Sequence, residues 1–145
     1  MSYTTWHIYG YGIRVSDIEV ESVEQIQALL NMAPEYEKKV RQWIEEENIE
    51  HPTVQDYEEA DQEFCLGLAT ILKEVIEEVE QIPFTACDDY NDIDYLLYEP
   101  SYPWYRGQSE HDLTEEKIHG ILSKYVSILT DKPIDIDYYS VENGG

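Results

Sequence analysis

Between Thr53 and Gln81 the apolar residues recur mostly at intervals of three or four, the spacing of one face of an α-helix. They are Tyr57, Phe64, Cys65, Leu68, Ile71, Leu72, Val75, Ile76 and Val79. Thr53 followed by Asp56 supplies a capping signal at the start, and Pro83 ends the pattern. The pattern predicts one long amphipathic helix over residues 53–81, with acidic residues on its other face and Gly67 as its single weak position.

Three shorter segments have the same helical periodicity. Ser22 and Gln25 form a capping box before a short helix, and Pro34 suits the first turn of a second one. A last helix is predicted over about residues 114–129, with Thr114 as its N-cap. Four helices are therefore expected.

Strands are predicted where aromatic and β-branched residues cluster or alternate with polar ones. The segments are Trp6–Val15, Phe84–Cys87, Ile93–Tyr98 and the run that follows Pro133. In the first strand Gly10 and Gly12 leave room for a close neighbour such as a crossing helix. In the last strand Ile134, Ile136 and Tyr138 are expected to point inward, with Asp135 and Asp137 outward.

The order of these elements indicates an α+β fold in a single domain over residues 1–145. We expect about four mostly antiparallel strands in one sheet, with four helices packed largely on one face. A chain of 145 residues is long enough to bury a real hydrophobic core. Neither an internal repeat nor an interdomain linker is apparent in the sequence.

The formal charge of −23 restricts the classes of partner. Nucleic acids and anionic membranes are bound by cationic patches, so direct binding to either is not expected. Between Arg41 and Arg106 the only basic residue is Lys73. The apolar fraction of 42% argues against wholesale disorder. A protein of this charge is expected to bind basic partners, because charge complementarity steers association.

The sequence contains no motif that names a reaction. No HExxH, GxSxG or phosphate-binding loop is present, and an enzyme or a bound cofactor is not expected. Asp88, Asp89, Asp92 and Asp94 could hold a divalent cation, but the cluster departs from the EF-hand pattern, and an Asp-rich solvated turn is the favoured explanation. Cys65 and Cys87 lack metal-site spacing and read as reduced thiols of a cytoplasmic protein. No signal peptide or membrane-spanning run is found.

These observations favour a non-enzymatic acidic inhibitor or decoy that presents carboxylates where phosphates would lie and binds the basic, nucleic-acid-binding surface of another protein. Small acidic proteins of this kind occur among phage and mobile-element inhibitors, including anti-CRISPR proteins; the analogy is one of charge and size. The residues expected to bind the partner are Glu58, Glu59, Asp61, Glu63, Glu74, Glu77, Glu78, Asp88, Asp89 and Asp92. Tyr102, Trp104 and Tyr105 are expected as additional aromatic anchors.

The alternative is a cytoplasmic immunity-type protein that recognises one specific partner mainly through aromatic side chains. Thirteen tyrosines make such a surface available. In this hypothesis the acidic residues serve mainly to keep the protein soluble. A homodimer formed through the tyrosine-rich sheet is compatible with either hypothesis.

Overall fold

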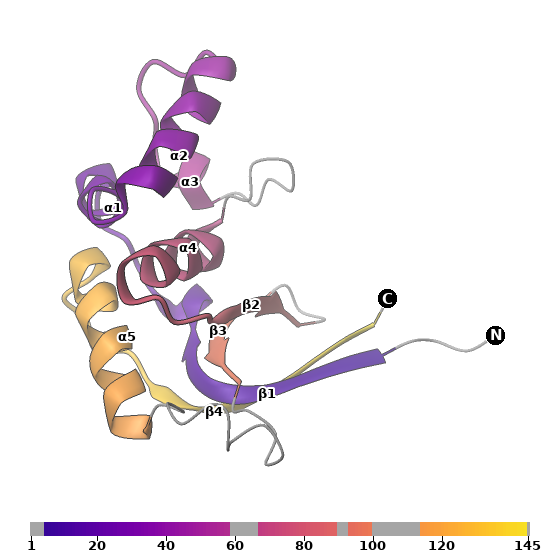
Figure 1. The fold of residues 1–145 in the computed structure, drawn as a ribbon. Coiled ribbons are helices and arrows are strands. Elements are labelled where there is room, and N and C mark those ends of the chain that lie inside the picture. Colours follow the sequence, from indigo (N-terminus) through magenta and orange to yellow (C-terminus); the bar gives the residue numbers. More distant parts are fainter. Residues whose placement is uncertain (1–4, 59–66, 90–92, 100–113, 145) are drawn as a thin grey trace.

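The structure, a computed structural model, describes residues 5–58, 67–89, 93–99 and 114–144. In chain order the elements are β1 (Thr5–Arg14), the 3-10 helix η1 (Val15–Asp17), α1 (Val23–Leu30), α2 (Pro34–Glu46), α3 (Val54–Glu58), α4 (Leu68–Glu80), β2 (Thr85–Asp88), β3 (Asp94–Tyr98), α5 (Glu115–Leu129) and β4 (Ile136–Gly144). The predicted α+β class is confirmed (Figure 1).

One antiparallel sheet contains the four strands in the order β2-β3-β1-β4. β1 pairs with β4 from Thr5 to Ile13 but with β3 only from Tyr11 to Arg14. The first half of β1 therefore extends with β4 beyond the part of β1 that pairs with β3. Figure 1 shows this two-stranded ribbon reaching away from the helices, with the start of β1 and the end of β4 at its tip.

The two glycines of β1 allow the strand to lie close against the backbone of β3. A Cβ built on Gly12 would lie 2.0 Å from the carbonyl oxygen of Leu96, and one on Gly10 would lie 2.7 Å from that of Tyr98. Real Cβ atoms do not approach backbone this closely, so only glycine fits at these positions. The close neighbour expected here is confirmed, but it is a strand and not a crossing helix.

The helices form two layers above one face of the sheet. α4 and α5 pack on the strands, and α1 and α2 pack on α4 and α5 (Figure 1). The main core lies between sheet and helices, where Ile13 of β1 and Leu96 of β3 meet Ile71, Leu122 and other side chains that are fully buried. The prediction of helices largely on one face is thus correct.

The single long helix predicted over residues 53–81 is wrong. α3 ends at Glu58, and α4 begins at Leu68 after Gly67, whose φ of 122° is incompatible with a helix. The backbone N–H of Gly67 donates to the carbonyl of Tyr57 at 3.2 Å. Ten residues of continuous helix would separate these groups by about 15 Å. Residues 59–66, between the two helices, lie outside the described part of the chain.

The other face of the sheet holds a second, smaller apolar cluster. Tyr95, Leu97 and Val141 are buried there, and Ile8 and Cys87 pack against them. Burial raises the pKa of the Cys87 thiol to about 11, so this free cysteine stays protonated at neutral pH. Within the described ranges, none of the helices has the length and apolarity needed to cross a bilayer.

The alternation predicted for the last strand is only partly correct. Ile134 and Ile136 pack against the main core, and Asp135 and Asp137 are exposed, as expected. Tyr138 was expected to point inward, but 41% of its surface is exposed. It pairs with Tyr11 across the sheet, and its ring packs on Tyr9 and Tyr11 of β1.

Candidate functional site

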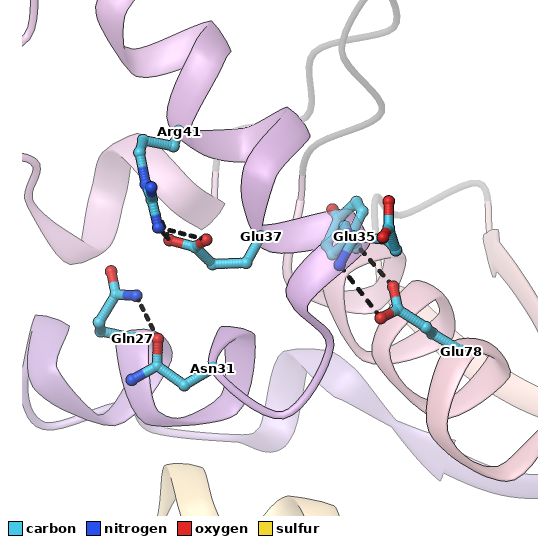
Figure 2. A network of polar contacts seen from close by, with 7 residues as sticks. Gln27, Asn31, Glu35, Glu37, Arg41 and Glu78 are labelled. Atoms are coloured by element: carbon cyan, nitrogen blue, oxygen red, sulfur yellow. Dashed lines mark hydrogen bonds and ion pairs between the residues drawn. The ribbon is translucent and has the colours of Figure 1, made fainter.

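Glu78 of α4, one of the predicted partner-binding residues, caps another helix. Its two carboxylate oxygens accept the backbone N–H groups of Glu35 at 3.2 Å and Tyr36 at 2.9 Å, in the first turn of α2 (Figure 2). The N-cap residue of α2 is Ala33, which has no side-chain acceptor, and the helix dipole favours a negative charge at this end. Glu78 therefore stabilises the contact between α4 and α2.

Glu74 and Glu77 share the single basic residue of α4. Lys73 lies 3.1 Å from the Glu77 carboxylate and 3.7 Å from that of Glu74. The side chain of Glu77 remains 47% exposed, and that of Glu74 remains 37% exposed. Both carboxylates are accessible to a partner, although Lys73 neutralises part of their charge.

Glu80, at the end of α4, was not among the predicted site residues and is tied to α5. It accepts a hydrogen bond from the Tyr125 hydroxyl at 2.5 Å and lies 3.2 Å from the Lys124 ammonium. The hydrogen bond from Tyr125 is the main reason that the pKa of Glu80 is lowered, and Lys124 adds to it. The carboxylates at the C-terminal end of α4 thus hold the helices together.

Asp88 and Asp89 lie at the end of β2, where the chain turns towards β3. Asp89 accepts the backbone N–H of Ile93 at 3.1 Å and the hydroxyl of Tyr95 at 3.3 Å. Asp88 is exposed and stands opposite Asp94 in the sheet. In the described part of the chain, no group of three potential ligands is placed to hold a metal ion.

The remaining predicted site residues are not tested by the structure. Glu58 ends α3, but its side chain is not described. The others lie outside the described residues: Glu59, Asp61, Glu63, Asp92, Tyr102, Trp104 and Tyr105.

Exposed glutamates follow one another in the sequence at the C-terminal end of α2. Glu45, Glu46, Glu47 and Glu50 are all exposed there, and we call these four residues the acidic end. Carboxylates at a helix C-terminus are disfavoured by the helix dipole, by about 0.3–1 kcal/mol each. No basic residue occupies the last turn of α2. Helix stability alone therefore does not account for the acidic end.

Within the described residues, only a few of the carboxylates form ion pairs. Six are paired with basic side chains: Asp17, Glu19, Glu37, Glu74, Glu77 and Glu80. One of these pairs, in which Arg41 lies 2.5 Å from Glu37, links successive turns of α2 (Figure 2). Most of the negative charge therefore remains on the surface, distributed over several elements and not gathered on α4.

Three tyrosines and one carboxylate form a compact, partly exposed group where β1 and β4 pass the start of α5. The rings of Tyr9 and Tyr138 are stacked, with centroids 5.5 Å apart, and Tyr11 packs edge-on against Tyr138 at 5.0 Å. The hydroxyl of Tyr138 donates to Glu115 of α5. This hydrogen bond is the first cause of a pKa of about 12 for Tyr138. We call these four residues the tyrosine cluster.

An open groove of about 490 Å³ runs between α5 and the segment that leads into β4. Its lining includes His119, Ser123, Ile134 and Ile136. The imidazole Nδ1 of His119 lies 3.4 Å from the Ser123 hydroxyl, a loose contact between successive turns of an exposed helix face. His119 is one turn of α5 beyond Glu115, and Ile136 is two residues before Tyr138, so the groove leads towards the tyrosine cluster.

Periodicity in the sequence did not reveal the tyrosine cluster, because its members come from β1, β4 and α5. Tyr9 and Tyr11 lie two positions apart in the predicted first strand and so share one of its faces, which is the only local signal in the sequence. Comparisons with protein-family models, with curated proteins and with solved structures find no significant match to this chain.

Proposed function

We propose that this protein is a non-enzymatic acidic inhibitor or decoy that binds the basic, nucleic-acid-binding surface of another protein. The observation that carries the proposal is the charge that folding leaves uncompensated. The chain has a formal charge of −23, and few of its carboxylates pair with basic side chains in the described residues. An ordered scaffold holds the rest on its surface.

The acidic end is the surface that we expect to make the principal contact. Its four glutamates lie within six positions of the sequence, on the last turn of α2 and the residues that follow it. Exposed carboxylates attract cationic surfaces, and arginines can bind them in bidentate fashion. Glu74 and Glu77 remain secondary candidates because they are exposed, whereas Glu78 and Glu80 are engaged in holding helices together.

The proposal is tested with proteins that already bind nucleic acid. Lysate proteins that bind heparin are passed over the immobilised chain at 50 mM and at 500 mM NaCl. Each retained protein is then identified and assayed for binding to duplex DNA with and without the chain. We expect retention at low salt only, and loss of DNA binding when the chain is added, because screening weakens contacts between exposed charges. Retention that does not depend on salt, or unchanged DNA binding, would overturn the proposal.

A matched pair of variants locates the contact. One variant changes Glu45, Glu46 and Glu47 to Gln. The other removes the same charge elsewhere by changing the exposed residues Glu21, Glu24 and Glu116 to Gln. If the acidic end binds the partner, the first variant loses at least ten-fold in affinity and the second loses much less. Equal losses would show that only the total charge matters.

The alternative function, recognition of a specific partner through aromatic side chains, is favoured by the tyrosine cluster. The stacked rings of Tyr9 and Tyr138 are 51% and 41% exposed, so part of their apolar surface is accessible to a partner. An aromatic complex should resist salt and should lose affinity when Tyr9 is changed to Ala. The salt series above therefore separates the two functions.

A further inference from the structure

The tyrosine cluster combines two properties that are seldom found at one exposed position. Tyr9 offers an aromatic ring face, because Tyr138 is the one ring of the described residues that stacks on it and half of its surface is exposed. Beside the rings lies the carboxylate of Glu115, of which Oε1 accepts the Tyr138 hydroxyl. Among the described residues, Oε2 has no hydrogen-bond partner.

In the part of the chain that the structure describes, the charged side chains that act on Tyr11 and Tyr138 are carboxylates. The pKa of Tyr11 is raised first by burial and then by the nearby carboxylates of Glu115 and Asp137. The pKa of Tyr138 is raised by Glu115 and by the neighbouring hydroxyls of Tyr9 and Tyr11. The Tyr138 hydroxyl thus meets a carboxylate beside two further tyrosines, and within the described ranges none of the groups acting on Tyr11 and Tyr138 is a basic side chain.

A guanidinium group fits both properties. It is planar and weakly hydrated, it stacks on aromatic faces, and it donates several parallel hydrogen bonds. An ammonium group is strongly hydrated and cannot stack in the same way. The chemistry of the cluster therefore selects arginine over lysine and rejects a neutral side chain of the same shape.

We infer that the tyrosine cluster is a docking site for an arginine side chain of a protein partner, with the guanidinium stacked on the free face of Tyr9 and hydrogen-bonded to Glu115. The neighbouring groove, lined by His119, Ser123 and Ile136, holds the chain that flanks this arginine. The inference rests on the proposed function, because the arginine belongs to the basic partner. It adds a specific recognition element to a surface that would otherwise attract any cation.

The test uses a small probe and the full chain. The tripeptide acetyl-Gly-Arg-Gly-amide is titrated into isotopically labelled protein at low salt, and amide chemical shifts are recorded. Two control peptides carry lysine or citrulline, the neutral isostere of arginine. For the arginine peptide we expect saturable shifts at Tyr9, Tyr138 and Glu115, with a dissociation constant on the order of 1 mM. The lysine peptide should bind several-fold more weakly, and the citrulline peptide should not bind. Shifts spread over all acidic residues without saturation, or equal shifts with citrulline, would overturn the inference.

Variants separate the site from general charge. Glu115→Gln should weaken arginine binding at least three-fold, whereas Glu116→Gln removes the same charge from the next residue of α5 and should leave it unchanged. Tyr9→Phe should retain binding because the ring face remains, and Tyr9→Ala should lose it. If Tyr9→Ala perturbs the fold, the Glu115 and Glu116 pair decides; equal effects of these two variants would exclude the site.

The peptide assay and the partner assay fail independently. Changing Glu45, Glu46 and Glu47 to Gln should leave the tripeptide affinity within about two-fold, because screening limits the reach of exposed charges. If the chain binds the tripeptide but inhibits no DNA-binding partner, the arginine site is supported and the decoy function is excluded. If the chain inhibits such a partner but does not bind the tripeptide, the decoy function is supported and the arginine site is excluded.

Discussion

The hydroxyl of Tyr125 on α5 donates a hydrogen bond to the carboxylate of Glu80 on α4, with 2.5 Å between the two oxygens. Tyr125 is fully buried, whereas the Glu80 side chain is 24% exposed. A phenol in this position would lose its partner if the two helices separated. The pair therefore connects the two helices that pack directly on the sheet.

Replacing Tyr125 by Phe removes the donor while keeping the ring. We expect the free energy of unfolding to fall by about 1–2 kcal/mol, because a hydrogen bond to a charged group is lost while Glu80 keeps Lys124. Urea denaturation measures the change. Lys124→Met is the control, and it should cost less than about 1 kcal/mol because an exposed ion pair contributes little. A larger loss in the control than in Tyr125→Phe would contradict this assignment.

Acidic pH should abolish the contribution of this pair. The pKa of Glu80 is lowered, first by the hydrogen bond from Tyr125, so it lies below the value in the unfolded chain. The resulting stabilisation is fully present above the unfolded pKa, about 4.3, and is lost as the pH falls through the folded pKa. The difference in unfolding free energy between wild type and Tyr125→Phe should be constant from pH 6 to 8 and should shrink below about pH 4. A constant difference down to pH 3 would exclude the ionised carboxylate as the acceptor.

Removing the cap that Glu78 provides should loosen the start of α2. Glu78→Ala leaves the N–H groups of Glu35 and Tyr36 without their acceptor, and we expect a loss of about 1 kcal/mol. Hydrogen exchange should show faster exchange at these two amides. Glu74→Ala, on the same helix, is the control, since it contacts only Lys73 in the described residues. Equal exchange in both variants would argue against the cap.

Two glycines should respond to alanine in opposite ways. Gly12→Ala would place a Cβ 2.0 Å from the carbonyl oxygen of Leu96, and relieving that overlap would require the central strands to move apart. We expect it to cost about 3 kcal/mol or more, or to prevent folding. Gly120 lies on the exposed face of α5, and a Cβ built there would have no neighbouring atom within 4 Å. Gly120→Ala should therefore stabilise the protein by about 0.5–1 kcal/mol. Thermal unfolding distinguishes the two, and a neutral Gly12→Ala would show that β1 can be rebuilt at little cost.

Salt should stabilise the whole protein. A net charge of −23 opposes compaction, and the Debye length shortens from about 30 Å at 0.01 M salt to about 8 Å at 0.15 M. The melting temperature should therefore rise as NaCl increases over this range. Sucrose, which carries no charge, is the control for general solute effects. A melting temperature that is insensitive to NaCl would mean that the carboxylates are too far apart to repel.

Local patterns in the sequence predicted the elements well. The capping box of Ser22 and Gln25 is present, and the Thr114 hydroxyl accepts the N–H of Lys117 at 3.2 Å, as the N-cap of α5 should. Periodicity did not reveal the break at Gly67, because apolar spacing continues through it. A glycine that requires φ of 122° is distinguished from a tolerated helical glycine only by its backbone.

The roles of the acidic residues could not be predicted, because their partners are distant in the sequence. Glu78 caps a helix that begins more than forty residues earlier, and Glu80 meets a tyrosine on the next helix along the chain. The density of acidic residues on α4 predicted a binding surface. In the structure, Glu78 and Glu80 instead form contacts between helices. The acidic end was visible in the sequence as three consecutive glutamates, but its exposure depends on where α2 ends.

Because Thr5 pairs with Gly144, the protein should resist mechanical force only weakly when it is pulled from these two residues. These residues face each other at the tip of the β1–β4 ribbon, so a force applied between them would act across the strands and break the ladder one bond at a time. Sliding the strands along each other would require many bonds to break together. Single-molecule pulling from these two points should therefore open the ribbon at low force, before the main core yields.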